Sequence, residues 1–87
     1  MYEIQLKREP EKFIRKQSGK IQIQLISALR KLRKDPRPRQ AKKLSGLDEL
    51  YRIRVGDYRI VYTIREKRLL ILVVRIAHRK DVYKKLL

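Results

Sequence analysis

The sequence contains no cysteine, one histidine and few acidic residues, and each shortage excludes a class of site. Without cysteine, disulfide bonds and thiolate metal sites are excluded. A single histidine and the lack of clustered carboxylates argue against a catalytic metal site, and we expect no cofactor. Long apolar runs are also missing, because none reaches the roughly 18 residues that a membrane span needs, and no signal peptide is visible. We therefore expect a cytoplasmic protein with no membrane partner.

The 87 residues carry a strongly positive charge on what we interpret as one small domain, residues 1–87. Lysine and arginine number 25 against 9 aspartate and glutamate residues, which gives a formal net charge of +16. The hydrophobic fraction of 43% is enough for a packed core, so the chain is not a disordered basic tail. Self-repulsion of this size opposes folding, and such chains bind polyanions, with nucleic acid as the first candidate.

The segment LYRIRVGDYRIVY, residues 50–62, predicts a β-hairpin around which the rest of the chain is arranged. Apolar and basic residues alternate on both sides of Gly56-Asp57, which is typical of two strands joined by a two-residue turn. Glycine at the first turn position favours a type II′ turn. The turn fixes the register, and directly opposed residues share one face of the sheet. The predicted opposed pairs are Val55 with Tyr58, Arg54 with Arg59, Ile53 with Ile60, and Arg52 with Val61.

Three arginines share one face of this predicted hairpin. Arg54 and Arg59 lie directly opposite each other, and Arg52 lies on the same face. Like charges in this arrangement repel each other and destabilise the sheet. A bound anion would remove that cost. The structural alternative is an ordinary solvated face whose long side chains splay apart.

The remaining chain predicts an α+β domain in which two N-terminal helices pack on one face of a mainly antiparallel four-stranded sheet. Apolar residues recur at helical spacing in the second helix, which ends where Asp35-Pro36 interrupts the hydrogen-bond ladder. The last strand is so apolar that both of its faces must be covered, which places it centrally. In chain order the expected elements are a strand at 2–6, helices at 9–17 and from 20, a cation-rich loop at 37–49, the hairpin, a strand at 69–77 and a short helix from Asp81.

The connection Arg65–Arg68 decides which face the end of the last strand presents. As a four-residue loop it pairs Val61 with Leu72, so that even-numbered residues of the last strand share a face with the three arginines. By that parity His78 emerges on the arginine face, and Arg75 lies on the opposite side as a structural or solvent-facing residue. We therefore expect helices on one side of the sheet, and the arginines with His78 on the other.

Such a surface supplies the groups that RNA cleavage without a metal needs: a base, cations for the charge on the phosphorane, and an acid for the leaving 5′-oxygen. Arginines hold phosphate oxygens bidentately. His78 can donate or accept a proton near neutral pH, and Tyr83 can stack on a nucleobase, orient a phosphate or act as a base. The structural alternatives are a polar cap at a strand end for His78 and a core contact of the last helix for Tyr83. Lys42 and Lys43 are interpreted as RNA-binding phosphate contacts of little specificity.

The segment KKLSGLDELYRIRVGDYRIVYTI, the apolar strand after it and HRKDVY together resemble the RelE/ParE superfamily of bacterial and archaeal toxins, particularly its RelE branch. The likeness covers nearly the whole chain, including the β-α-α-β-β-β order and the short terminal helix. The motifs are specific in combination, and each alone is weak. By this resemblance the chain is a toxin of a toxin–antitoxin system, a ribosome-dependent endoribonuclease that cuts messenger RNA in the A site. The resemblance also implies a cognate antitoxin that wraps the toxin in an oligomeric complex.

The resemblance carries the functional residues of the family onto six positions of this chain. By position they are Arg52, Arg54, Arg59, His78, Arg79 and Tyr83. Some members have lysines in the first hairpin strand where this chain has arginines, which removes a lysine-type base there. It stays open whether His78, Tyr83 or an arginine moves the proton. The expected reaction is attack of a 2′-hydroxyl on the adjacent phosphate, with the arginines holding the phosphate, His78 as proton donor, and Tyr83 as base or stacking group.

Three other readings compete with this one. A toxin of the ParE branch shares the fold but blocks DNA gyrase by binding. A plain RNA-binding or ribosome-binding module would bind with a steep salt dependence and cleave nothing. A toxin that has lost its activity would survive only as a partner of its antitoxin.

Overall fold

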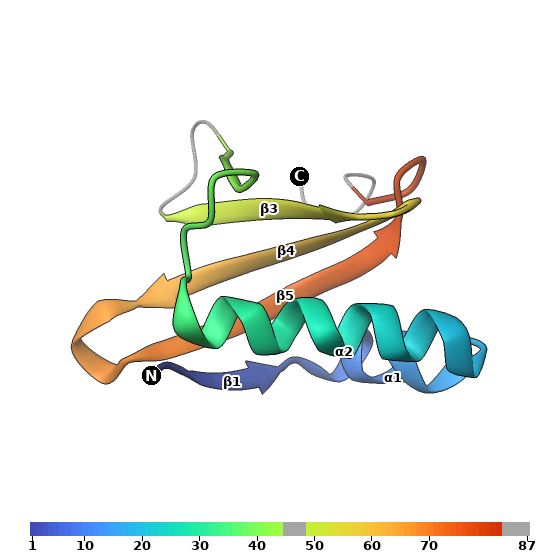
Figure 1. The fold of residues 1–87 in the computed structure, drawn as a ribbon, viewed down its shortest axis with the longest axis horizontal. Helices are drawn as coiled ribbons and strands as arrows, with labels where there is room; N and C mark the ends of the chain where they lie inside the picture. Colours follow the sequence, from blue (N-terminus) through green and yellow to red (C-terminus); the bar gives the residue numbers. More distant parts are fainter. Residues whose placement is uncertain (45–48, 83–87) are drawn as a thin grey trace.

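A computed structural model of the chain describes residues 1–44 and 49–82. Two helices cover one side of a twisted sheet, and the last strand lies inside that sheet (Figure 1). The predicted α+β class is therefore confirmed. In chain order the elements are β1 (Glu3–Leu6), α1 (Arg8–Lys16), α2 (Gly19–Lys34), β2 (Lys42–Lys43), β3 (Leu50–Val55), β4 (Tyr58–Arg65), the 3₁₀ turn η1 (Glu66–Arg68) and β5 (Leu70–His78).

The sheet has five strands in the order β1-β5-β4-β3-β2, where four were expected. The additional strand is β2, whose two lysines pair antiparallel with the start of β3. It was missed because two consecutive lysines carry no apolar alternation. β5 is central as predicted, and it pairs parallel with β1 and antiparallel with β4.

The hairpin of β3 and β4 has the predicted register. Val55 opposes Tyr58 and Arg54 opposes Arg59 across the turn. Gly56 has φ of +59°, which an L side chain rarely adopts. The positive φ falls on the first turn residue, as a type II′ turn requires.

The connection from β4 to β5 differs from the predicted one by a single residue. Four residues connect the strands, but they are 66–69, because Arg65 still pairs with Leu70. Leu69 closes the turn at φ of +48°. The predicted pairing of Val61 with Leu72 is therefore wrong, since Leu72 opposes Thr63. The strand pairing is shifted by two positions, so the residues at the start of β5 keep the sides of the sheet that were predicted for them.

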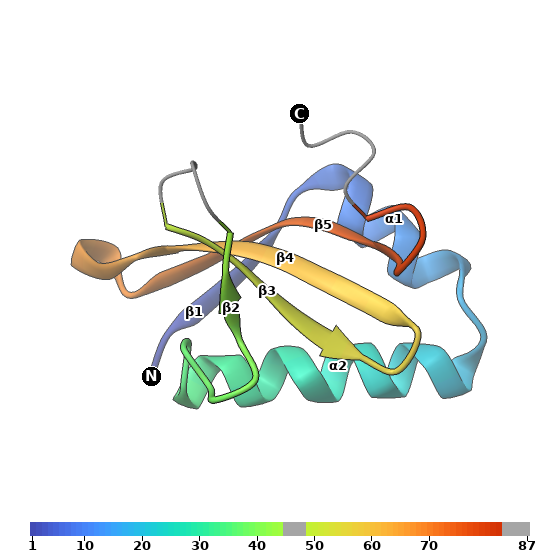
Figure 2. The ribbon, with the colours of Figure 1, turned by 90° about the horizontal axis from the view of Figure 1, so that it is seen from above.

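The core lies between the helices and one face of the sheet (Figure 2). α2 contributes the stripe Leu25, Leu29 and Leu32, all buried, and ends at Lys34 directly before Asp35-Pro36 as expected. Tyr62 is fully buried, and its hydroxyl donates to the carbonyl oxygen of Pro36 at 2.7 Å. This bond ties the end of α2 to the middle of β4. Within the described residues, neither helix is long and apolar enough to span a membrane.

A polar cluster fixes the loop after α2 at the end of the sheet opposite the hairpin turn. Arg37 forms an ion pair with Glu66 at 2.6 Å, and its Nε donates to the hydroxyl of Tyr51 at 3.0 Å. The hydroxyl of Tyr2 donates to the other oxygen of Glu66 at 2.6 Å. Glu66 thus links β1, the loop after α2 and the β4–β5 connection through one carboxylate.

Replacing Glu66 by glutamine is expected to make stability less dependent on pH. Hydrogen bonds from Tyr2 and Arg37 lower the pKa of the Glu66 carboxyl. Its pKa in the folded protein lies below the ordinary value of 4.5, so the ionised carboxylate stabilises the fold above that pH. This stabilisation is lost as the pH falls through the lowered pKa. Urea unfolding should therefore place the wild-type midpoint above that of Glu66→Gln at pH 7, and the difference should shrink at pH 3.5. An equal difference at both pH values would contradict this role.

Candidate functional site

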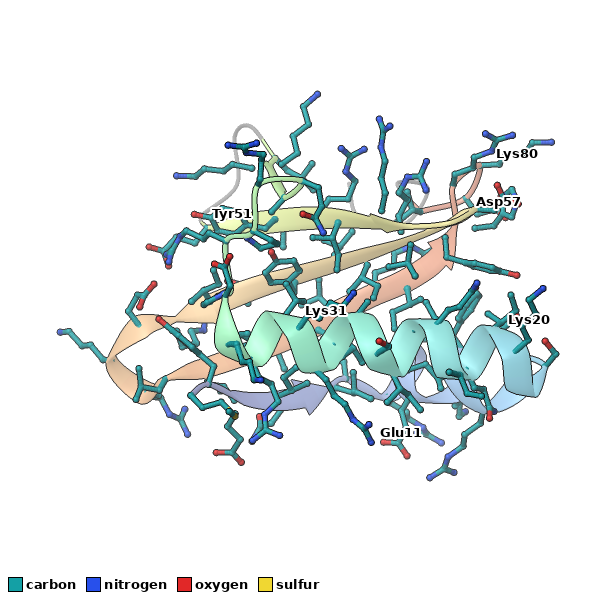
Figure 3. All side chains as sticks on the ribbon, in the orientation of Figure 1. Glu11, Lys20, Lys31, Tyr51, Asp57 and Lys80 are labelled. Atoms are coloured by element: carbon teal, nitrogen blue, oxygen red, sulfur yellow. The ribbon has the colours of Figure 1, made fainter. Side chains whose placement is uncertain are left out.

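The face of the sheet that points away from α1 and α2 is rich in cations. Figure 3 shows side chains that end in nitrogen projecting above the sheet, on the side away from α2. We call this surface the cationic face. By strand register it contains Lys42, Arg52, Arg54, Arg59, Arg65 and Arg75. The predicted grouping of the three hairpin arginines is therefore observed.

Arg52 lies near the middle of this face and has a buried donor without a partner. Its Nε is enclosed, and among the described residues no acceptor lies within hydrogen-bond distance. Lys42 stands directly opposite it on β2, and the residue opposite on β4 is Val61. An unpaired buried donor costs about 1–3 kcal/mol, and more when it is charged. The Nε is too enclosed to reach a ligand itself, so an anion on this face would meet the half-buried Arg52 through its other donors.

Arg59 is oriented by the hairpin turn. Its Nη1 donates to the carbonyl oxygens of Gly56 at 2.9 Å and Tyr58 at 2.8 Å. These bonds keep the guanidinium at the hairpin end of the cationic face. Arg54, directly opposite, is exposed. The two charges therefore concentrate positive potential at that end of the sheet.

A bulge in β5 reverses the alternation of the strand before it ends. Tyr62 opposes Val73 but Val61 opposes Arg75, so Val74 is an extra residue. In an unbroken strand Arg75 would follow Val73 into the core, where an unpaired charge costs several kcal/mol. The bulge turns Arg75 to the cationic face and buries Ile76, which is 3% exposed. The predicted side of the sheet for Arg75 is therefore wrong, although Arg75 and His78 do lie on opposite sides as predicted.

The same bulge moves His78 away from the arginines. His78 opposes Tyr58 and lies on the helix side of the sheet, so its predicted place on the cationic face is wrong. Its ring contacts the ring of Tyr58 edge-on at 5.9 Å, and Tyr58 contacts Phe13 edge-on at 5.8 Å. The Nδ1 of His78 accepts from the backbone N–H of Lys80 at 3.2 Å. This is the polar cap at a strand end that was the structural alternative.

His78 borders a hollow of about 430 Å³ between α1 and the end of β5, and Arg75 and Asp81 also line it. Lys12 and Lys16 of α1 also line it, together with Phe13 and Glu9. The opposed arginines do not border this hollow. His78 and the arginine pair are therefore separate features of the same end of the sheet.

Arg79 lies beside the hairpin turn, directly after β5. Its backbone N–H donates to the carbonyl oxygen of Asp57 at 2.8 Å, which joins the turn after β5 to the hairpin turn. Figure 3 labels Asp57 of the hairpin turn and Lys80 of the turn after β5 at the same end of the sheet. Tyr83 and most of the predicted terminal helix lie outside the described residues, while Asp81 and Val82 form a turn.

The two lysines of β2 point to different sides of the sheet. Lys42 opposes Arg52 and joins the cationic face, whereas Lys43 opposes Tyr51, whose side chain packs against the core. Both lysines are exposed. Within residues 1–44 and 49–82, no group of three histidine, cysteine, aspartate or glutamate residues could hold a metal ion.

Comparison with known proteins gives matches to toxins of the RelE and ParE types. The family model of the ParE toxin of type II toxin–antitoxin systems, parDE, matches residues 5–83. A curated protein of Methanocaldococcus jannaschii, named as the toxin RelE1, is 34% identical over 56 residues. That match covers 61% of this chain and 62% of the relative, so the chain spans less than two thirds of the relative's length.

Two solved structures share the fold. A chain of the intact RelBE toxin–antitoxin complex of E. coli superposes with a TM-score of 0.80 at 24% identity, covering 90% of this chain and 96% of that one. A chain of the archaeal RelE–RelB complex from Pyrococcus horikoshii OT3 gives a TM-score of 0.80 at 25% identity, over 90% and 94%. Because the family model covers nearly all residues, the chain belongs to the ParE toxin family of type II toxin–antitoxin systems, within the RelE/ParE superfamily.

Proposed function

We propose that this toxin is of the ribosome-dependent RelE type and cleaves messenger RNA in the ribosomal A site without a metal ion. The observation that carries the proposal is the cationic face, where Arg54 opposes Arg59 and the Nε of Arg52 is buried without a partner among the described residues. Arginines opposed across two strands concentrate positive charge on this face. An RNA phosphate bound there would be held by that charge.

The proposed reaction begins when the 2′-oxygen attacks the adjacent phosphorus and loses its proton to a base. The bond from phosphorus to the 5′-oxygen then breaks, and that oxygen takes up a proton from solvent water. The products are a 2′,3′-cyclic phosphate and a free 5′-hydroxyl. Arg52, Arg54, Arg59 and Arg79 would hold the phosphate and stabilise the additional negative charge of the phosphorane.

Proton transfer has to be reassigned because His78 lies on the other side of the sheet. Arginine keeps its proton in proteins, so its natural part is charge stabilisation. We therefore assign a proton-transfer or base-stacking role to Tyr83 alone, on the resemblance of the HRKDVY segment. Lys42, opposite Arg52, is assigned to phosphate binding with Lys43 as a peripheral contact.

A cognate antitoxin is the second proposed partner, beside the ribosome and its message. The E. coli and P. horikoshii structures are of RelE with RelB, and the former is a toxin–antitoxin complex. A formal charge of +16 favours an acidic antitoxin segment that covers the cationic face.

A ParE-type function is the competing candidate, and two observations favour it. The family model carries the ParE description, and the histidine expected as a proton donor is absent from the cationic face. On this reading the arginines bind an acidic surface of DNA gyrase, and no phosphate bond is broken.

The deciding experiment adds the purified protein to a defined message with and without translating ribosomes, and maps the new 5′ ends. Codon-phased cuts with 5′-hydroxyl ends that need the ribosome are the expected result. A parallel supercoiling assay with purified gyrase tests the alternative. Gyrase inhibition without any cut message would overturn the RNase proposal, and binding without either effect would leave a binding module.

A further inference from the structure

The chain reverses direction sharply after β5 and returns over the cationic face. The N–H of Asp81 donates to the carbonyl oxygen of His78 at 2.8 Å, which closes a turn. Val82 then packs on Val61 and Ala77, and all three are buried. A small apolar cluster therefore lies among the arginines and fixes the chain at Val82.

Arg75 holds this returning segment by two hydrogen bonds. Its Nε donates to the carbonyl oxygen of Val82 at 2.7 Å, and its Nη2 donates to that of Asp81 at 3.0 Å. A guanidinium presents parallel donors in a rigid plane, so it can bind two successive carbonyls at once. A lysine ammonium has no such fork and would hold one carbonyl at a time.

The position of Arg75 is explained by these bonds better than by phosphate binding. The bulge places Arg75 opposite Val61, and Val61 lies opposite Arg52 on the next strand. Arg75 and Arg52 are therefore two strands apart, which is about 10 Å at the ordinary strand spacing. Another positive charge there adds to the repulsion on this face. Its Nε and Nη2 are already engaged by backbone carbonyls, which leaves less of the guanidinium for a ligand.

We infer that Arg75 is a positioning residue for the proposed cleavage. Tyr83 follows Val82 directly, and consecutive Cα atoms are 3.8 Å apart. By fixing the carbonyls of Asp81 and Val82, Arg75 holds the residue to which Tyr83 is bonded in place over the cationic face. This inference rests on the proposed RNase function, and it adds a residue that touches neither RNA nor the reacting atoms.

Arg75→Met tests the inference, with Arg75→Lys as the conservative variant. We expect kcat for ribosome-dependent cleavage to fall 10-fold or more, on the order of the loss from misplacing a catalytic group. KM for the programmed ribosome should change less than about 3-fold, because the phosphate-binding arginines remain. Arg75→Lys should recover part of kcat. Arg68→Met, which removes an exposed cation of η1, is the matched control and should change kcat less than about 2-fold.

Hydrogen exchange gives a readout that does not depend on activity. Arg75→Met should speed exchange in the peptide from residue 79 to the C-terminus and leave α2 and β3 protected. An active wild type with unchanged kcat in Arg75→Met, or unchanged exchange in that peptide, would overturn the positioning role alone. A wild-type protein that cuts no message would remove the RNase function and the positioning role together.

Discussion

Replacing Arg52 by alanine is expected to slow cleavage of ribosome-bound message by about 100-fold or more, the usual loss when one preorganised donor to a transition-state oxyanion is removed. The Nε of Arg52 has no partner within the described residues, so the substitution breaks no described bond of that atom. It also removes a charge that faces Lys42. Because the unpaired buried donor is itself unfavourable, the free energy of unfolding should rise by about 1–3 kcal/mol. Single-turnover cleavage at saturating ribosome, together with urea unfolding, measures both quantities.

Arg30→Ala is the matched control for Arg52→Ala. Arg30 is an exposed arginine of α2, on the other side of the sheet from the cationic face, and its removal makes the same change in net charge. A small and equal loss of activity in both variants would mean that net charge alone sets the rate. Cleavage by Arg52→Ala at the wild-type rate would remove this residue from the site.

Replacing Leu25 by alanine is expected to cost about 2–5 kcal/mol of unfolding free energy, the range for a fully buried leucine that leaves a cavity. Leu25 is 0% exposed and lies in the stripe of α2 that packs on the sheet. For a domain of this size, the loss should lower Tm by more than about 8 °C. Thermal and urea unfolding followed by circular dichroism would measure it.

Ile23 on the same helix provides the control, because its side chain is 71% exposed. Alanine there removes little buried surface and has the higher helix propensity, so stability should change by less than about 0.5 kcal/mol. Equal losses in both variants would show that the stripe of α2 is not the one that packs on the sheet.

The hairpin could be predicted residue by residue because its turn leaves one register. Gly56 and Asp57 fix the turn, and a slip of one position would place Arg54 in the core and Ile60 in solvent. Apolar spacing located α2 in the same way. These local patterns were enough to place Arg52 and Arg59 together.

The side of the sheet on which His78 lies could not be predicted from the alternation, because one bulge residue moves every later residue of the strand to the opposite side. The signal was nonetheless in the sequence, since Arg75 interrupts a strand that is otherwise apolar. An unbroken alternation would bury that arginine and expose Ile76, which is energetically unfavourable. A charged residue at a position of an apolar strand that simple alternation would bury therefore indicates a bulge. Lys42 opposite Arg52 had no comparable signal, because a two-residue strand has no period.

The pairing of β1 with β5 has a consequence for synthesis of the protein. The first strand of the chain finds its neighbour only in the last, and β4 also waits for β5 on one side. On a translating ribosome the two helices and the β3–β4 hairpin can form from local contacts, but the sheet cannot close until β5 has left the exit tunnel. Arg75 and the anchored Val82 belong to that last segment. A nascent chain therefore lacks a complete cationic face until its synthesis is nearly finished.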